Sequence, residues 1–148
     1  MKIYLDNCCF NRPYDDQNQL SIHLETEAKL YVQDLVFTKR LDLVWSYVLD
    51  VENARSPFDE RRTEILLWRN RSIHIVEPVV DIVPLAQRFA LVGLKGPDAL
   101  HVSCAIYGRC EYFLTVDHGI LKRANQIKDI AILSPIAFLD VLKQEGIT

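Results

Sequence analysis

Four acidic residues interrupt apolar segments of this chain, where an unpaired charge would be costly. Asp6 and Asp117 each follow a short strand-like run, Asp98 lies in the first turn of an expected helix, and Glu52 lies further into another. Carboxylates that converge repel one another, so such a cluster needs a cation to offset its charge. Carboxylate oxygens suit hard divalent ions, and the four acids therefore predict a site for Mg²⁺ or Mn²⁺.

The elements that would position these acids alternate along the chain between short apolar runs and helical periodicity. This alternation favours an α/β fold with a parallel sheet and helices on both faces. Strands are expected over residues 2–5, 41–45, 73–76, 112–116 and 131–133. After a polar loop over 11–18, helices are expected from about 20, from 46 or 47, and over 57–69, 81–92, 97–108, 118–126 and 135–144. Because parallel strands end at one edge of a sheet, the four acids are expected to meet there.

Each acid also has an ordinary structural explanation. Asp98 can complement a helix dipole, Asp117 can cap a helix, and Glu52 can pair with Arg55 on a helix surface. The joint pattern is what favours a shared site. Asp50 lies nearly opposite Glu52 on the same helix and is assigned to the surface.

The composition bounds the class of protein. The chain has 148 residues, 49% of them hydrophobic and 25% charged, and a net charge of -3. These values favour a single globular domain over residues 1–148 and argue against bulk electrostatic wrapping of nucleic acid. No apolar run reaches the roughly 20 residues of a membrane span, and an acid at position 6 argues against a secretory signal. A cytoplasmic location is expected.

Four cysteines occur, at positions 8, 9, 104 and 110. They form no C-x-x-C pair, and reduced, buried thiols are expected. A zinc site from Cys8, Cys9, His101 and Cys104 is conceivable, but its spacing matches no standard zinc pattern.

Four fragments around the acids, in order, resemble the PIN-domain family over nearly the whole chain. They are Leu5-Asp6-Asn7, Ser46 with Glu52 six positions later, Asp98-Ala99 with Ala105, and Leu114-Thr115-Val116-Asp117. The chain departs from the family pattern at Asn7, where Thr or Ser is usual, at the unusual Cys8-Cys9 pair, and at Ala105, which lies one place late.

The resemblance implies a three-layer α/β/α sandwich and a metal-dependent ribonuclease. Many small bacterial members are VapC-like toxins held inactive by a cognate antitoxin, so an antitoxin is an implied partner. Members also commonly form homodimers. Tyr31, Trp45 and Trp68 are candidate dimer contacts, although core packing is the alternative for each.

The expected mechanism is hydrolysis of RNA by a water activated on Mg²⁺ or Mn²⁺. Asp6, Asp98 and Asp117 are the expected metal ligands, and Glu52 is expected to bind a second ion or orient the attacking water. Supporting hydrogen bonds to the carboxylates are expected from Asn7, Ser46 and Thr115. Candidate RNA contacts, each with a structural alternative, are Arg12, His101, Lys122 and Arg123.

Three other classes of function are the alternatives to this one. A non-catalytic RNA-binding or protein-interaction domain would keep the fold without turnover. A phosphatase of the haloacid dehalogenase type needs Asp-x-Asp after the first strand, whereas this chain has Asp6-Asn7-Cys8. A dinucleotide-binding domain lacks its Gly-x-Gly-x-x-Gly signature here.

Overall fold

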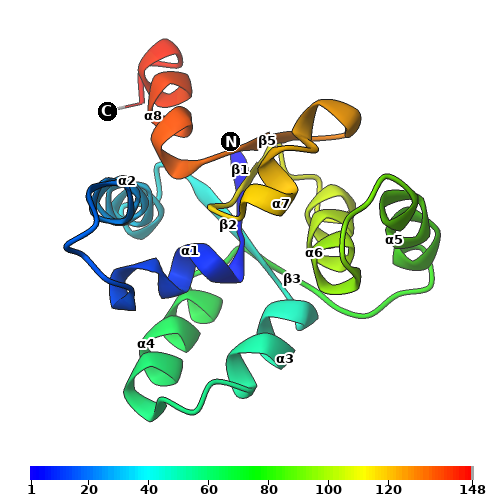
Figure 1. Cartoon of the computed structure of the whole chain (residues 1–148), viewed down its shortest axis with the longest axis horizontal. Helices are drawn as coiled ribbons and strands as arrows, with labels where there is room; N and C mark the ends of the chain where they lie inside the picture. The colour runs from blue at the N-terminus through cyan, green and yellow to red at the C-terminus, as the bar shows by residue number, and fades with distance from the viewer. Residues whose placement is uncertain (148) are drawn as a thin grey trace.

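The computed structural model describes residues 1–147 and contains one five-stranded sheet with all strands parallel (Figure 1). The order of strands across the sheet is β3-β2-β1-β4-β5. The strands are β1 (Lys2–Leu5), β2 (Asp42–Ser46), β3 (His74–Val76), β4 (Tyr112–Leu114) and β5 (Ala131–Leu133). The α/β prediction with a parallel sheet is confirmed.

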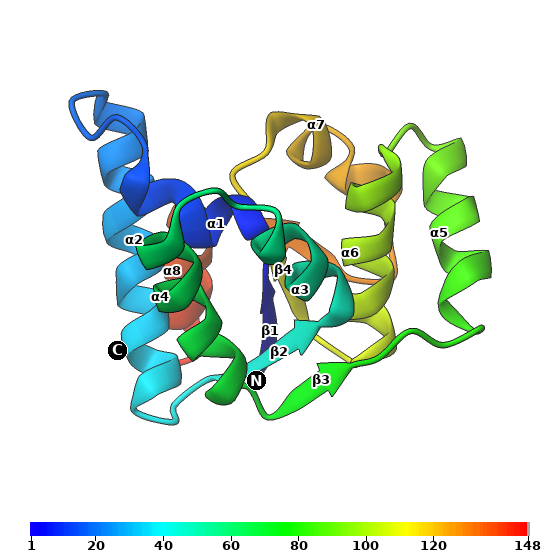
Figure 2. The ribbon, with the colours of Figure 1, turned by 90° about the horizontal axis from the view of Figure 1, so that it is seen from below.

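Helices connect successive strands. They are α1 (Asn7–Asn11), α2 (Leu20–Phe37), α3 (Tyr47–Ala54), α4 (Asp59–Asn70), α5 (Ile82–Leu91), α6 (Gly96–Tyr107), α7 (His118–Leu121) and α8 (Pro135–Gln144). Two 3₁₀ turns are also present, η1 (Arg12–Tyr14) and η2 (Ala124–Gln126). Figure 2 shows α2, α4 and α8 on one side of the sheet and α5 and α6 on the other, so the predicted three layers are present.

The central strand is buried on both faces. Ile3, Tyr4 and Leu5 in β1 have no exposed surface, and Phe113 and Leu114 in the neighbouring β4 have none either. This continuous run of apolar residues, without alternation, is what helices on both faces of a parallel sheet require. The aromatic ring of Tyr4 stacks on that of Phe113, with centroids 5.4 Å apart.

The order of strands creates a topological switch beside β1. The chain moves from β1 to β2 and β3 in one direction, then returns to place β4 and β5 on the other side of β1. The crevice at the carboxyl ends of the strands that flank such a switch is the usual ligand site of open α/β sheets. Asp6 directly follows β1, and Thr115 directly follows β4.

Several boundaries differ from those predicted. The first residues of the expected polar loop are helical, because Asp6 caps α1 and Pro13 supports the 3₁₀ turn η1 that follows. The expected helix over 118–126 is two short pieces, α7 and η2, and the strand expected to reach Val116 ends at Leu114. Gly93, which directly follows the helix expected over 81–92, has a φ of 101°, which a residue with a side chain rarely adopts.

None of the helices within residues 1–147 is both long enough and apolar enough to cross a membrane.

Candidate active site

Asp6 lies at the centre of the candidate site and is almost fully buried, with 4% of its surface exposed. Its Oδ1 accepts a hydrogen bond from the backbone N–H of Asn7 at 2.8 Å and thereby caps α1. Its Oδ2 accepts from Thr115 Oγ1 at 2.8 Å and from Cys8 Sγ at 3.3 Å. In all three hydrogen bonds the carboxylate accepts. The donors come from the segment after β1 and the segment after β4, which together fix the orientation of the carboxylate.

Thr115 joins the two acids that follow the central strands. Its hydroxyl donates to Asp6, and the same oxygen accepts from the backbone N–H of Asp117 at 3.1 Å. The pairing of Leu5 with Leu114 in the parallel ladder brings these positions together. Thr115 therefore makes the carboxylate contact expected of it from the sequence.

Asp117 is exposed and caps α7, so the structural role considered for it in the sequence is present. Its Oδ1 accepts from the backbone N–H of Ile120 at 3.1 Å. Gly119 leaves room for this carboxylate, because a Cβ at that position would lie 2.9 Å from Asp117 Oδ1. The second oxygen of the carboxylate is left for another partner.

Glu52 is held from two sides, by Asn7 and His101. Asn7 Nδ2 donates to Glu52 Oε2 at 3.3 Å, and His101 Nε2 forms a short ion-paired hydrogen bond with Glu52 Oε1. The same His101 nitrogen lies 3.8 Å from Asp6 Oδ1. The imidazole therefore lies between two acids that are 46 positions apart in the chain.

A buried hydrogen-bond chain supports His101 from behind. Its Nδ1 contacts the Tyr4 hydroxyl at 2.6 Å, and that hydroxyl contacts Ser46 Oγ at 2.6 Å. Ser46 Oγ also accepts from the backbone N–H of Leu49 and caps α3. The contact expected of Ser46 was a carboxylate. The structure corrects this, because the hydroxyl reaches the acids only through Tyr4 and His101.

The charges of the acids act on one another at Asp98. Burial first, and then the negative charges of Asp6, Asp117 and Glu52, together raise the pKa of this carboxyl to about 6, against a lowering effect of His101. The three other acids are thus near enough for their fields to oppose ionisation of Asp98. The charges of these acids therefore act on one another, while their shared role as a site stays a prediction.

His101 responds to the same field in the opposite sense. Burial alone would lower the pKa of the imidazole, but the hydrogen bond to Glu52 and the charges of Asp6, Glu52 and Asp98 outweigh it and raise the pKa. The ring is 1% exposed. The expected RNA contact of His101 is therefore corrected, because the ring is enclosed by protein and faces the acids.

Cationic side chains border the acids. A pocket of about 280 Å³ is lined by Asp98 and Asp117 together with Lys95, Lys122 and Arg123. Arg123 also donates to the carbonyls of Val92 at 3.1 Å and Gly119 at 3.0 Å, which braces the loop after α5 against α7. Lys95 was not among the predicted site residues, although its place three residues before Asp98 was a usable signal.

Other predicted residues lie apart from the acids. Arg12 pairs with Asp15 at 3.0 Å and lies 3.9 Å from Glu25, so its RNA contact stays a prediction. Asp50 accepts from Trp45 Nε1 and from Arg69, which agrees with its assignment away from the site.

Of the two uses considered for Trp45, core packing is the one observed, because this side chain has no exposed surface and cannot contact a partner. The prediction for the cysteines agrees with the structure, in which all four are free thiols and three are buried.

The four acids provide oxygen donors of the kind that a divalent ion binds. Within residues 1–147, no three His, Cys, Asp or Glu side chains are arranged to hold a metal ion directly. The chemistry of the set nevertheless fits a hard cation, because the acids offer only oxygen and their repulsion raises the pKa of Asp98. Mg²⁺ keeps several waters and does not require three direct protein ligands. The ligand roles of Asp6, Glu52, Asp98 and Asp117 stay a prediction.

Comparison with known proteins places the fold. No family model matches the sequence, and no curated protein matches it. Among solved structures, this chain is similar to one chain of the crystal structure of VapBC2 from Rickettsia felis, with a TM-score of 0.57. In that structure VapBC2 is bound to a DNA fragment from its promoter. The alignment covers 89% of this chain and 97% of that chain at 16% identity. The chain has a PIN-like fold.

The PIN-like fold confirms the resemblance that the four sequence fragments indicated. At 16% identity the likeness concerns the fold alone. The chemistry of the site therefore depends on the residues described above.

Proposed function

We propose that this protein is a metal-dependent endoribonuclease that hydrolyses RNA phosphodiester bonds with Mg²⁺ or Mn²⁺. The observation that carries the proposal is the mutual influence of Asp6, Glu52, Asp98 and Asp117 at the carboxyl edge of a PIN-like sheet. A pocket lined by Asp98 and Asp117 beside Lys95 and Lys122 suits a cation and a phosphate in turn.

In this proposal Asp6, Asp98 and Asp117 hold the ion, directly or through water. The ion, when bound, supplies a water of lowered pKa and neutralises charge on the scissile phosphate. Asp6 is held rigidly by Thr115 and by the start of α1, so its carboxylate does not need to reorganise. Lys122 is exposed at the rim, where it can bind an RNA phosphate.

Glu52 orients the attacking water in this proposal. Asn7 and His101 hold both of its oxygens, which fixes the position of the carboxylate. His101 also supplies positive charge between Glu52 and Asp6, which lets two acids ionise close together. A second ion at Glu52 is the alternative use of the same carboxylate.

The proposal is tested with purified protein, single-stranded RNA and either Mg²⁺, Mn²⁺ or a chelator. Cleavage is expected with either ion and not with the chelator. Asp6→Asn and Asp98→Asn should lower the rate by about 10²-fold or more, because they remove charge that holds the ion. Asp50→Asn is the matched control, since Asp50 bonds to Trp45 and Arg69 instead. Undiminished cleavage in both site variants would rule out this mechanism.

One observation favours a second function, that of a non-catalytic RNA-binding or protein-interaction domain. No ready three-residue metal cluster is present in the described part of the chain. Such a domain would bind RNA equally well with chelator and with Mn²⁺ and would never cut it. The same metal titration therefore separates the two functions.

The partner proposed for this protein is a cognate antitoxin. The support is the fold shared with the VapBC2 structure from Rickettsia felis, together with the proposed nuclease activity. Expression of the wild-type chain should arrest growth, and co-expression of a small DNA-binding protein encoded immediately upstream should relieve the arrest. Arrest by Asp6→Asn as well would argue against toxicity through cleavage.

A homodimer is proposed through one apolar face formed by α2 and α8. Exposed or half-exposed apolar side chains gather there, namely Leu24, Tyr31, Ile136 and Leu139. Light scattering after size exclusion should give twice the chain mass, and Tyr31→Glu should reduce it to the single mass, because it places a charge in the apolar contact.

A further inference from the structure

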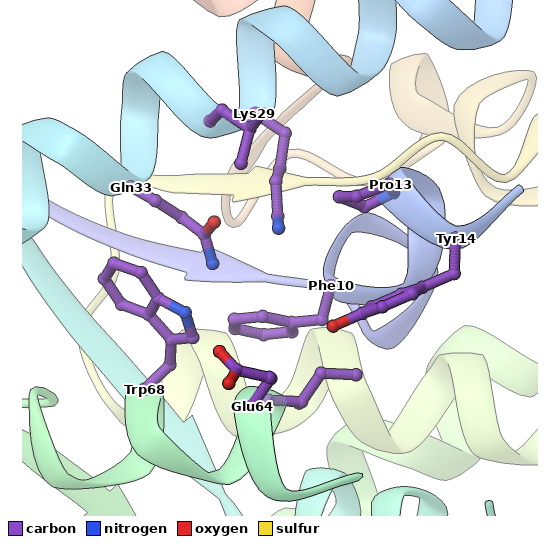
Figure 3. Close-up of a pocket in the computed structure, with 9 residues that line it drawn as sticks. Phe10, Pro13, Tyr14, Lys29, Gln33, Glu64 and Trp68 are labelled. Carbon is purple, nitrogen blue, oxygen red and sulfur yellow. The ribbon is translucent and has the colours of Figure 1, made fainter. Parts of the chain in front are cut away.

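A second pocket lies between α1, α2 and α4, apart from the acids of the candidate active site (Figure 3). Its volume is about 250 Å³, smaller than the pockets that bind drug-sized molecules. Phe10 forms its floor, and Tyr14 and Trp68 lie at its sides. Three aromatic side chains around one small space suit a planar ring.

Two buried donors from α2 point into this pocket. Lys29 and Gln33 are one helical turn apart, and each is only 4% exposed. Within residues 1–147, Gln33 Nε2 has no hydrogen-bond partner. The Nζ of Lys29 lies 5.9 Å from the centroid of the Phe10 ring, which also lines the pocket.

Unpaired buried donors are costly to a folded protein. The buried amide N–H of Gln33 costs free energy unless an acceptor meets it. Burial lowers the pKa of Lys29 to about 8, so an acceptor beside this ammonium would also be favourable. A ligand with two adjacent acceptor atoms would satisfy both side chains at once.

The opposite wall carries an acceptor. Glu64, on α4, presents its carboxylate across the pocket from Lys29 and Gln33, as Figure 3 shows. The ligand that fits is therefore planar, accepts on one edge and donates on the other. A simple anion does not fit, because it would meet Glu64 with like charge.

Guanine has this arrangement of atoms. Its N7 and O6 are adjacent acceptors, the pair that Lys and Arg read in nucleic acids, and its N2 amino group is a donor on the far side. Adenine places a donor, N6, beside its N7 acceptor; the Gln33 amide could pair with both atoms, but Lys29, which can only donate, would then have no acceptor on that edge. We propose that this pocket binds an unstacked guanine base between Phe10, Tyr14 and Trp68, read by Lys29, Gln33 and Glu64.

The inference that this guanine is part of the RNA substrate rests on the proposed nuclease function. The two sites share α1, since Asp6 caps its start and Phe10 lies four residues later, about 6 Å along the helix. Single-stranded RNA is commonly bound with bases splayed out and stacked on aromatic side chains. A base near the scissile phosphate can therefore reach this pocket while its backbone crosses the acids.

The binding test uses the full chain and the four nucleoside 5′-monophosphates in chelator, so that no metal ion links phosphate to the acids. Quenching of Trp68 fluorescence reports binding, since Trp45 is in the core. GMP is expected to bind at least about tenfold more tightly than AMP, CMP or UMP. Equal binding of all four, or none, would overturn the proposal. Binding of N-acetyltryptophan but of no nucleotide would show an aromatic side chain as the occupant and would also overturn it.

Variants separate this inference from the nuclease proposal. Lys29→Met keeps the apolar stem and should weaken GMP binding about tenfold, whereas Lys29→Arg should retain it. Lys143→Met, on the exposed side of α8, is the matched control. Asp6→Asn should bind GMP normally even though it does not cut RNA. If no RNA is cut under any condition while GMP selectivity depends on Lys29, the nuclease proposal fails and the guanine site stands.

Discussion

Among the individual residues, Asp98 is the one whose ionisation responds to the three other acids of the site and to His101. Its carboxyl has a raised pKa of about 6, first because it is partly buried and then because Asp6 and Asp117 repel its charge. A group that resists ionisation in the native state makes stability depend on pH. It also makes a bound cation favourable, since the cation relieves the repulsion.

The pH dependence of Asp98 gives the first prediction. Between about pH 4 and pH 6 the native carboxyl holds a proton that the unfolded chain has released. Its contribution to the free energy of unfolding is therefore complete below about pH 4 and is lost as pH rises through about 6. Urea denaturation from pH 4 to pH 7 should show wild type losing stability relative to Asp98→Asn. A difference that does not change with pH would contradict this.

His101 acts as a positioning residue, and His101→Ala gives the second prediction. The variant leaves Glu52 and the Tyr4 hydroxyl without their shared partner and should cost about 1–3 kcal/mol of stability. The pKa of Asp98 should rise further, because the imidazole lowers it. NMR titration of Asp98 measures this effect. An unchanged pKa would mean that the ring serves packing alone.

At the element scale, the ends of strands β1 and β4 carry the site. The parallel register that pairs Leu5 with Leu114 brings the following residues, Asp6 and Thr115, into hydrogen-bond contact. The short helices α1 and α7 then begin on Asp6 and Asp117 as caps. The same carboxylates thus start helices and form the acidic cluster.

Thr115→Val tests the link between the two strand ends. Removal of the hydroxyl leaves Asp6 Oδ2 and the Asp117 N–H without their best partner, with an expected loss of about 1–3 kcal/mol in the free energy of unfolding. Affinity for Mn²⁺ should fall about 10–100-fold. Thr115→Ser keeps the hydroxyl and should restore the affinity. If Val and Ser variants bind Mn²⁺ equally, the hydroxyl does not orient Asp6.

Gly119→Ala tests the start of α7. The added methyl group would lie 2.9 Å from Asp117 Oδ1, so the carboxylate must move. RNA cleavage is expected to fall about tenfold or more, because small displacements of a catalytic group are costly. The melting temperature should change little, since Gly119 has an ordinary φ and lies at the surface. Gly96→Ala, where the added group meets open space, is the control.

At the scale of the whole molecule, one continuous core spans both faces of the sheet. Helices α2 and α8 cover one side and α6 the other, so no group of elements has a core of its own (Figure 2). A chain of this size with one core is expected to unfold as a single unit.

Leu43→Ala measures this cooperativity. Leu43 in β2 is fully buried, and its truncation should lower the free energy of unfolding by about 2–5 kcal/mol. The denaturant slope should stay unchanged, because the same surface is exposed on unfolding. Far-ultraviolet circular dichroism and tryptophan fluorescence should report one shared transition. Two separate transitions would contradict a single domain.

Local patterns in the sequence were enough to predict the class of fold, which the structure confirms, and to single out the four acids as candidate site residues. Apolar runs such as residues 2–5 and helical periodicity such as that of 135–144 are local patterns, and each predicted element of this kind is present in the structure. The placement of Asp6 and Asp117 at strand ends was equally local. The helix α1 was missed because a polar, Cys-rich segment has no apolar periodicity and becomes helical only once Asp6 caps it.

Which side chains contact one another depends on tertiary packing and could not be predicted from local patterns in the sequence. No local spacing encodes the ion pair of His101 with Glu52 or the hydrogen bonds that link Ser46 through Tyr4 to His101. The same is true of the pocket into which Lys29 and Gln33 point. The physical reason is that these contacts depend on the order and register of the strands. Those are set by how the whole core packs, and many registers are compatible with the same short apolar runs.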